Sequence, residues 1–169
     1  LADEGFFWDG VQRVMLGEVP IHAFMTYDPG RYYWSGALLS LSHSHGIIAV
    51  RVTAAIFQAL GVFIGLITLA RSTTKQSPWW WALVAFTLTL WMYPWFKVFD
   101  VCCAIALVGA FTFLIDKPSY RRYFLVGFTV GLAAVFGRNH GVYGLVASLG
   151  VMIYLAIGSK KDLKIFKTL

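Results

Sequence analysis

Residues 47–70, IIAVRVTAAIFQALGVFIGLITLA, decide the fold, because this long apolar run contains a single charged side chain, Arg51. A helix needs about 20 apolar residues to cross the hydrocarbon core of a membrane. Four further apolar segments follow at about 78–95, 100–116, 122–138 and 141–157. None of the five shows the apolar–polar alternation of a barrel strand, and backbone groups in lipid need partners within their own segment. The sequence therefore predicts an all-α membrane protein, a bundle of five transmembrane helices.

The composition supports a membrane protein over a soluble one. Of the 169 residues, 59% are hydrophobic and 13% are charged, which is too apolar for an ordinary soluble domain. The net charge of +6 does not indicate nucleic-acid binding, because the basic residues separate the apolar runs and do not gather on one face. Cys102 and Cys103 are adjacent in an apolar segment, so they match neither a redox pair nor a spaced metal site.

The chain divides into three parts. Residues 1–45 are polar and rich in aromatic residues, residues 46–158 contain the five predicted spans, and residues 159–169 form a basic segment. The chain begins with Leu1 and has no signal segment, so we expect it to be part of a longer protein.

The distribution of basic residues predicts the orientation of the bundle. Loops that face the cytoplasm are enriched in lysine and arginine, and every second break between the apolar segments is basic. These breaks contain Arg71, Lys75, Lys117, Arg121, Arg122, Lys160, Lys161, Lys164 and Lys167. The remaining breaks are then extracytoplasmic and share one compartment with residues 1–45. That compartment holds Asp3, Glu4, Asp9, Asp28, Arg31, His43, His45, Arg51, Lys97, Asp100, Arg138 and His140.

Two helices are expected within residues 1–45. The run DEGFFWDGVQRVMLGEVP, residues 3–20, places Phe6, Phe7, Val11, Val14 and Met15 close to one helical stripe, as in a helix that lies along a membrane interface. The run TYDPGRYYWSG, residues 26–36, then supplies a turn at Asp28-Pro29-Gly30 before a second aromatic segment.

These runs resemble the first extracytoplasmic loop of bacterial GT-C glycosyltransferases, which include protein O-mannosyltransferase-like and aminoarabinose-transferase-like enzymes. In that family the loop opens with an acidic pair, forms interfacial helices and carries a proline-rich turn before two aromatic residues. The later run VFGRNHGVYGL, residues 135–145, is similar to a short outward turn beside the lipid-phosphate site of these enzymes. The resemblance implies an inverting glycosyltransferase of the plasma (inner) membrane, whose donor is a sugar on a polyprenyl phosphate.

The resemblance also implies roles for individual residues. Asp3 takes the place of the catalytic carboxylate, a general base on the hydroxyl of a glycan, lipid or protein acceptor, and Glu4 is the alternate. The departing lipid phosphate requires cations, and the candidates are Arg138, ranked first, with His140, Lys97 and Arg31. The Asp28-Pro29-Gly30-Arg31 turn departs from the family pattern of a basic residue before two prolines. Asp28 is therefore a candidate ligand, with Asp3 or Glu4, for Mg²⁺ or Mn²⁺.

Purely structural interpretations stand beside these roles. Asp3 and Glu4 can cap a helix, Arg138 can anchor a helix end, and Lys97 can pair with Asp100 one helical turn away. Arg51 is expected to extend toward the interface, and His43 and His45 to lie in a solvated loop.

Two other functions fit the same sequence. A transporter subunit would carry ionisable groups near the middle of its spans, but the central parts of these segments contain none. A non-catalytic membrane scaffold in glycan assembly would keep the fold without the chemistry.

Overall fold

Every regular element of the described chain is a helix. The computed structural model describes residues 2–74, 77–93 and 97–166, with side chains described for residues 3–158 within those ranges. The prediction of an all-α protein is confirmed for these residues. The helices are α1 (Ala2–Met15), α2 (Pro29–Ser42), α3 (Ile47–Ser72), α4 (Pro78–Trp91), α5 (Val98–Asp116), α6 (Tyr120–Phe136) and α7 (Arg138–Phe166). Of the predicted basic residues, Lys75 and Lys167 lie outside the described residues, as do the side chains of Lys160, Lys161 and Lys164.

Three of the helices are long and apolar enough to cross a membrane. They are α3 with 26 residues, α5 with 19 residues and the first 21 residues of α7. The other two apolar segments form shorter helices, since α4 has 14 residues and α6 has 17. The α4 helix ends before the predicted boundary at residue 95, and Pro94 disfavours a helical conformation for the residue before it. The structure thus supports a membrane protein with three candidate spans.

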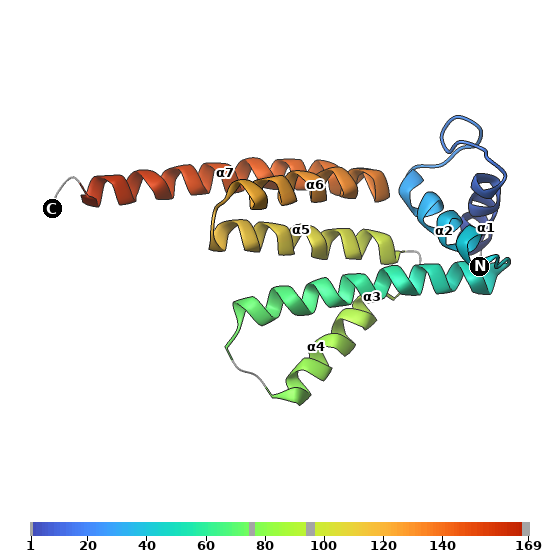
Figure 1. The fold of residues 1–169 in the computed structure, drawn as a ribbon, viewed down its shortest axis with the longest axis horizontal. Helices are drawn as coiled ribbons and strands as arrows, with labels where there is room; N and C mark the ends of the chain where they lie inside the picture. The colour runs from blue at the N-terminus through green and yellow to red at the C-terminus, as the bar shows by residue number, and fades with distance from the viewer. Residues whose placement is uncertain (1, 75–76, 94–96, 167–169) are drawn as a thin grey trace.

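The helices α3, α5, α6 and α7 lie along the long axis, while α4 diverges from α3 and the short helices α1 and α2 cover one end (Figure 1). At the other end, Arg71 and Arg122 both contact Phe113 of α5: Arg71 lies 4.6 Å from the centre of its ring, and Arg122 donates to its carbonyl. The two sets of charged residues that the sequence separates therefore occupy opposite ends of the bundle.

Small residues allow the helices of the bundle to approach closely. On α3, Gly61 faces α5, where an added Cβ atom would overlap the Cys102 sulfur, and Gly65 lies between Leu88 of α4 and Ile105 of α5. The α6 and α7 backbones approach at Gly141, where a Cβ atom would lie 2.6 Å from Cα of Ala134. Glycine at such positions increases van der Waals contact between helices in lipid, where no hydrophobic effect drives association.

An aromatic cluster holds α1 and α2 on the end of the bundle. The Phe7 ring of α1 lies 5.5 Å from Tyr32 of α2 and 5.8 Å from Phe99 of α5. The indole of Trp34 donates to the carbonyl of Thr53 at 2.9 Å, which ties α2 to α3. The predicted stripe on α1 is therefore mostly buried against protein, with Phe7 and Val11 inside and only Phe6 strongly exposed, at 52%.

We expect Gly141→Ala to lower the free energy of unfolding by about 1–3 kcal/mol, because the added methyl group overpacks a contact with backbone. Gly150→Ala on the same helix is the matched control, since a Cβ atom at Gly150 has no neighbour within 4 Å. Thermal unfolding in detergent can be followed by the reaction of the buried thiols Cys102 and Cys103 with a fluorescent maleimide. Equal melting temperatures for the two variants would contradict the α6–α7 contact.

Candidate functional site

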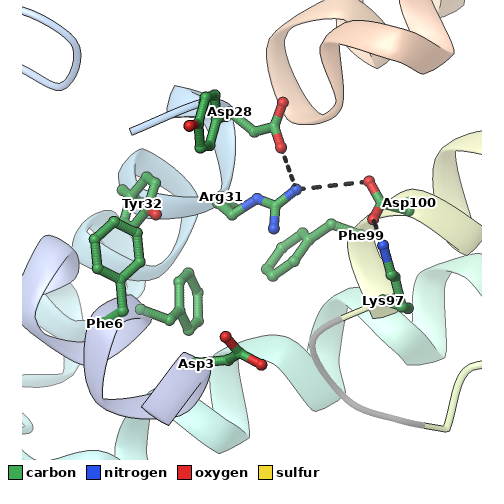
Figure 2. Close-up of a pocket in the computed structure, with 10 residues that line it drawn as sticks. Asp3, Phe6, Asp28, Arg31, Tyr32, Lys97, Phe99 and Asp100 are labelled. Atoms are coloured by element: carbon green, nitrogen blue, oxygen red, sulfur yellow. Dashed lines mark hydrogen bonds and ion pairs between the residues drawn. The ribbon is translucent and has the colours of Figure 1, made fainter. Parts of the chain in front are cut away.

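A polar pocket of about 230 Å³ lies where α1, α2 and the start of α5 meet (Figure 2). One part of its wall is aromatic, formed by Phe6, Phe7, Tyr27, Tyr32 and Phe99. The rest of the wall is charged, formed by Asp3, Asp28, Arg31, Lys97 and Asp100.

A second hollow of about 280 Å³ adjoins the first and reaches the start of α7. The two share Tyr27, Asp28, Lys97 and Asp100, and the second adds residues 137–140, which include Arg138 and His140. The structure therefore brings six of the seven predicted site residues to one place. The exception is Glu4.

The Glu4 carboxylate forms an ion pair with Arg51 of α3. Its side chain is only 5% exposed and receives two bonds from the Arg51 guanidinium, one from Nε and one from Nη2 at 2.9 Å. The hydrogen bonds from Arg51 hold the pKa of Glu4 below its ordinary value of 4.5. A carboxylate with both oxygens bonded and a lowered pKa is a poor proton acceptor, which argues against Glu4 as the alternate base. Arg51 thus has a protein partner in Glu4.

Asp3 differs from Glu4 both in its exposure and in its hydrogen bonding. Its side chain is exposed and makes no hydrogen bond or ion pair with the other described residues. Figure 2 shows its carboxylate directed into the pocket, across from Arg31 and Asp100. Of the two acidic residues at the start of α1, only Asp3 has carboxylate oxygens without a hydrogen-bond partner among the described residues.

Asp28 connects α2 to α7. One of its oxygens accepts from Nη2 of Arg31 at 2.6 Å, and the other accepts from the backbone N–H of Arg138 at 3.0 Å. Because Arg138 is the first residue of α7, the Asp28 carboxylate satisfies a free amide at the positive end of that helix. Sequence patterns do not reveal this cap, since the two residues are 110 positions apart.

The geometry does not favour a metal ion at Asp28. Both of its oxygens already have donors, and Glu4 is bonded to Arg51. Among the described residues, no three His, Cys, Asp or Glu side chains lie close enough together to hold a metal ion.

Asp100 was not among the predicted site residues and was expected only to pair with Lys97. Its carboxylate lies 3.7 Å from Lys97, and also 3.5 Å from Arg31 and 3.7 Å from Nδ1 of His140. The pairing with Lys97 is confirmed, while the contacts with Arg31 and His140 come from tertiary packing. Gly137 leaves room for this arrangement, because a Cβ atom there would lie 3.0 Å from both Asp100 and His140.

Two nitrogens of the site are buried without a hydrogen-bond partner among the described residues. They are Nε of Arg31 and Nδ1 of His140. Burial of an unpaired polar group is costly, and Nε of an arginine can only donate. These two nitrogens therefore have hydrogen-bonding capacity that no described residue uses.

The other predicted cations are more open. Lys97 is 58% exposed, and Arg138 is exposed with its guanidinium carbon 5.9 Å from the centre of the Tyr27 ring. His43 and His45 lie outside the site, exposed in the turn between α2 and α3. No family model, curated protein or solved structure matches this chain.

The Glu4–Arg51 pair predicts a specific dependence of stability on pH. Because the pKa of Glu4 is lowered in the folded state, its stabilisation is complete above the ordinary glutamate pKa of 4.5. It is lost as the pH falls through the lowered pKa. We expect Glu4→Gln to melt below the wild type at neutral pH and to approach it in acid.

Melting can be followed by tryptophan fluorescence in detergent, from neutral pH to about pH 3. Glu18→Gln is the control, since Glu18 pairs with Arg13 at 3.3 Å but is 40% exposed. A difference between Glu4→Gln and the wild type that stays constant throughout the range would contradict the pair.

Proposed function

We propose that this chain is part of a membrane glycosyltransferase that transfers a sugar from a polyprenyl-phosphate donor to an acceptor hydroxyl, with inversion at the anomeric carbon. The observation that carries the proposal is the free Asp3 carboxylate, which faces Arg31 and Lys97 across a pocket of about 230 Å³. A base and an array of cations on opposite walls are what an alcohol nucleophile and a phosphate leaving group require.

In the proposed reaction, the acceptor oxygen attacks the anomeric carbon while the bond from that carbon to the phosphate oxygen breaks. The bonding electrons leave with the lipid phosphate, and the hydroxyl proton passes to a carboxylate oxygen of Asp3. The new glycosidic bond lies on the face opposite the old one, so the configuration inverts. The aromatic rings beside Asp3, among them Phe6 and Phe99, give the sugar an apolar wall.

The leaving phosphate gains negative charge as its bond to the sugar breaks, and four basic residues line the pocket and the adjoining hollow, namely Arg31, Lys97, Arg138 and His140. Nε of Arg31 and Nδ1 of His140 are buried without partners among the described residues, while Lys97 and Arg138 are exposed. Charge-assisted hydrogen bonds from such groups are about twice as strong as neutral ones. No step of this proposal uses a metal ion.

The proposal includes five spans in the plasma (inner) membrane, with the pocket on the extracytoplasmic side. The support is the position of Arg71, Lys117, Arg121 and Arg122, which lie at the end of the bundle away from the pocket (Figure 1). An excess of lysine and arginine marks cytoplasmic loops. Because α4 and α6 are short, their crossings require flanking residues that reach the interface, or a locally thinner bilayer.

A transporter is less well supported by the interior of the bundle. Its buried hydroxyls at Thr68, Thr129 and Ser148 donate to carbonyls four residues earlier in their own helices. Hydroxyls committed in this way do not line a polar route across the membrane. In the apolar helices α3 to α7, the charged residues with described side chains lie at or near the helix ends.

We expect Asp3→Asn to reduce sugar transfer by about 10²- to 10⁴-fold, the usual contribution of a positioned general base. Asp9→Asn is the matched control, because Asp9 lies on the same helix but pairs with Arg13 at 2.9 Å, outside the pocket. Membranes that contain the full-length protein would be incubated with labelled polyprenyl-phospho-sugars, and the labelled product identified. Undiminished transfer by Asp3→Asn would remove the assignment of the base, and solute flux without transfer would favour a transporter.

Cysteine labelling tests the topology separately. In a background that lacks Cys102 and Cys103, a cysteine at Ser44 should react with an impermeant maleimide from the extracytoplasmic side. One at Ser119, between α5 and α6, should react only after the membrane is opened. Labelling of both positions from the same side would contradict an odd number of spans between them.

A further inference from the structure

The polar pocket has an excess of negative charge, although the proposed ligand is an anion. Three carboxylates, Asp3, Asp28 and Asp100, line it with only two cations, Arg31 and Lys97. Arg138 and His140 add positive charge in the adjoining hollow. Asp3 has a role in the proposed reaction and Asp28 caps α7, so the carboxylate that remains to be explained is Asp100.

Asp100 is held less tightly than the structural carboxylates. Asp28 bonds to Arg31 at 2.6 Å, whereas Arg31, Lys97 and His140 all lie 3.5–3.7 Å from Asp100. The Asp100 side chain is nevertheless only 19% exposed, so its charge is poorly screened by water. It lies among the same cations that would hold a phosphate, which means that any bound anion is a near neighbour of this carboxylate.

The substrate and the product of the proposed reaction differ in charge. The donor is a phosphodiester with one negative charge, and the released polyprenyl phosphate is a monoester with a charge of about −1.5 to −2 at neutral pH. A fixed negative charge beside the phosphate repels the monoester more strongly than the diester. Discrimination by such a repulsive element is a common source of specificity.

From this charge arrangement, and on the basis of the proposed function, we infer that Asp100 is a specificity-determining residue that makes the site prefer a phosphodiester over a phosphomonoester. The preference favours donor binding and expulsion of the product, a step that limits turnover in many enzymes. The charged and titratable groups that face Asp100 are Arg31 and Asp28 from α2, Arg138 and His140 from α7, and Lys97 at the start of its own helix. Asp3 of α1 lies across the pocket.

The test compares two ligands that differ in one charge. Purified full-length protein in detergent is titrated with dodecyl phosphate and with dodecyl methyl phosphate, above neutral pH, by calorimetry. Wild-type protein should bind the diester more tightly. In Asp100→Asn, which keeps the shape and removes the charge, we expect the ratio of the monoester Kd to the diester Kd to fall about tenfold. Asp100→Glu should retain most of the preference.

Asp116→Asn is the matched control, since Asp116 lies on the same helix at the opposite end and is 71% exposed. Three results would overturn the inference: a wild-type preference for the monoester, no binding of either ligand, or an equal change in both affinities in Asp100→Asn. The first two results are measured on the wild-type protein, so they test the inference even where Asp100→Asn fails to fold. A shifted preference in a protein that transfers no sugar would overturn the proposed function alone, and transfer with an unshifted preference would overturn this inference alone.

Discussion

The packing of Phe99 against rings from three other helices determines where the charged groups of this protein can lie. Its centroid is 5.8 Å from Phe7 of α1, 4.8 Å from Phe57 of α3 and 5.9 Å from Phe136 of α6. The next residue, Asp100, points to a different side of α5 and meets Arg31 and His140. One turn of helix therefore provides both the apolar contact that positions α1 and the carboxylate around which the cations gather.

The acidic residues at this end of the bundle differ in how firmly they are bonded. This difference distinguishes carboxylates that connect helices from carboxylates without close partners. Glu4 and Asp28 each have both oxygens bonded, with contacts to arginine side chains or to the start of α7. Asp100 has partners only at 3.5–3.7 Å, and Asp3 has none among the described residues. Carboxylates of similar intrinsic acidity are thereby divided into two that hold helices in place and two that can respond to a ligand.

The sequence predicted the helices well because hydropathy is a local property. Each of the five apolar segments overlaps one helix, although α4 and α6 are shorter than a span requires and only three helices are candidate spans. The partners of the charged residues could not be predicted in the same way. Glu4 and Arg51 are 47 positions apart, and Asp28 and Arg138 are 110 apart, so tertiary packing alone brings them together. The pairing of Asp100 with Lys97 could be predicted because the two lie one helical turn apart, whereas its contacts with Arg31 and His140 could not.

The Glu4–Arg51 pair has a second effect, which follows from the adjacency of Glu4 to Asp3. Successive residues of a helix point in directions about 100° apart, so fixing Glu4 against α3 also fixes the direction of Asp3. The bonds that remove Glu4 from proton transfer therefore hold its neighbour toward the pocket. The proposed base needs a free lone pair, and Asp3 makes no hydrogen bond or ion pair with the other described residues. In the proposed glycosyltransferase, an acidic pair with one bonded and one free member would supply both position and reactivity in two consecutive residues.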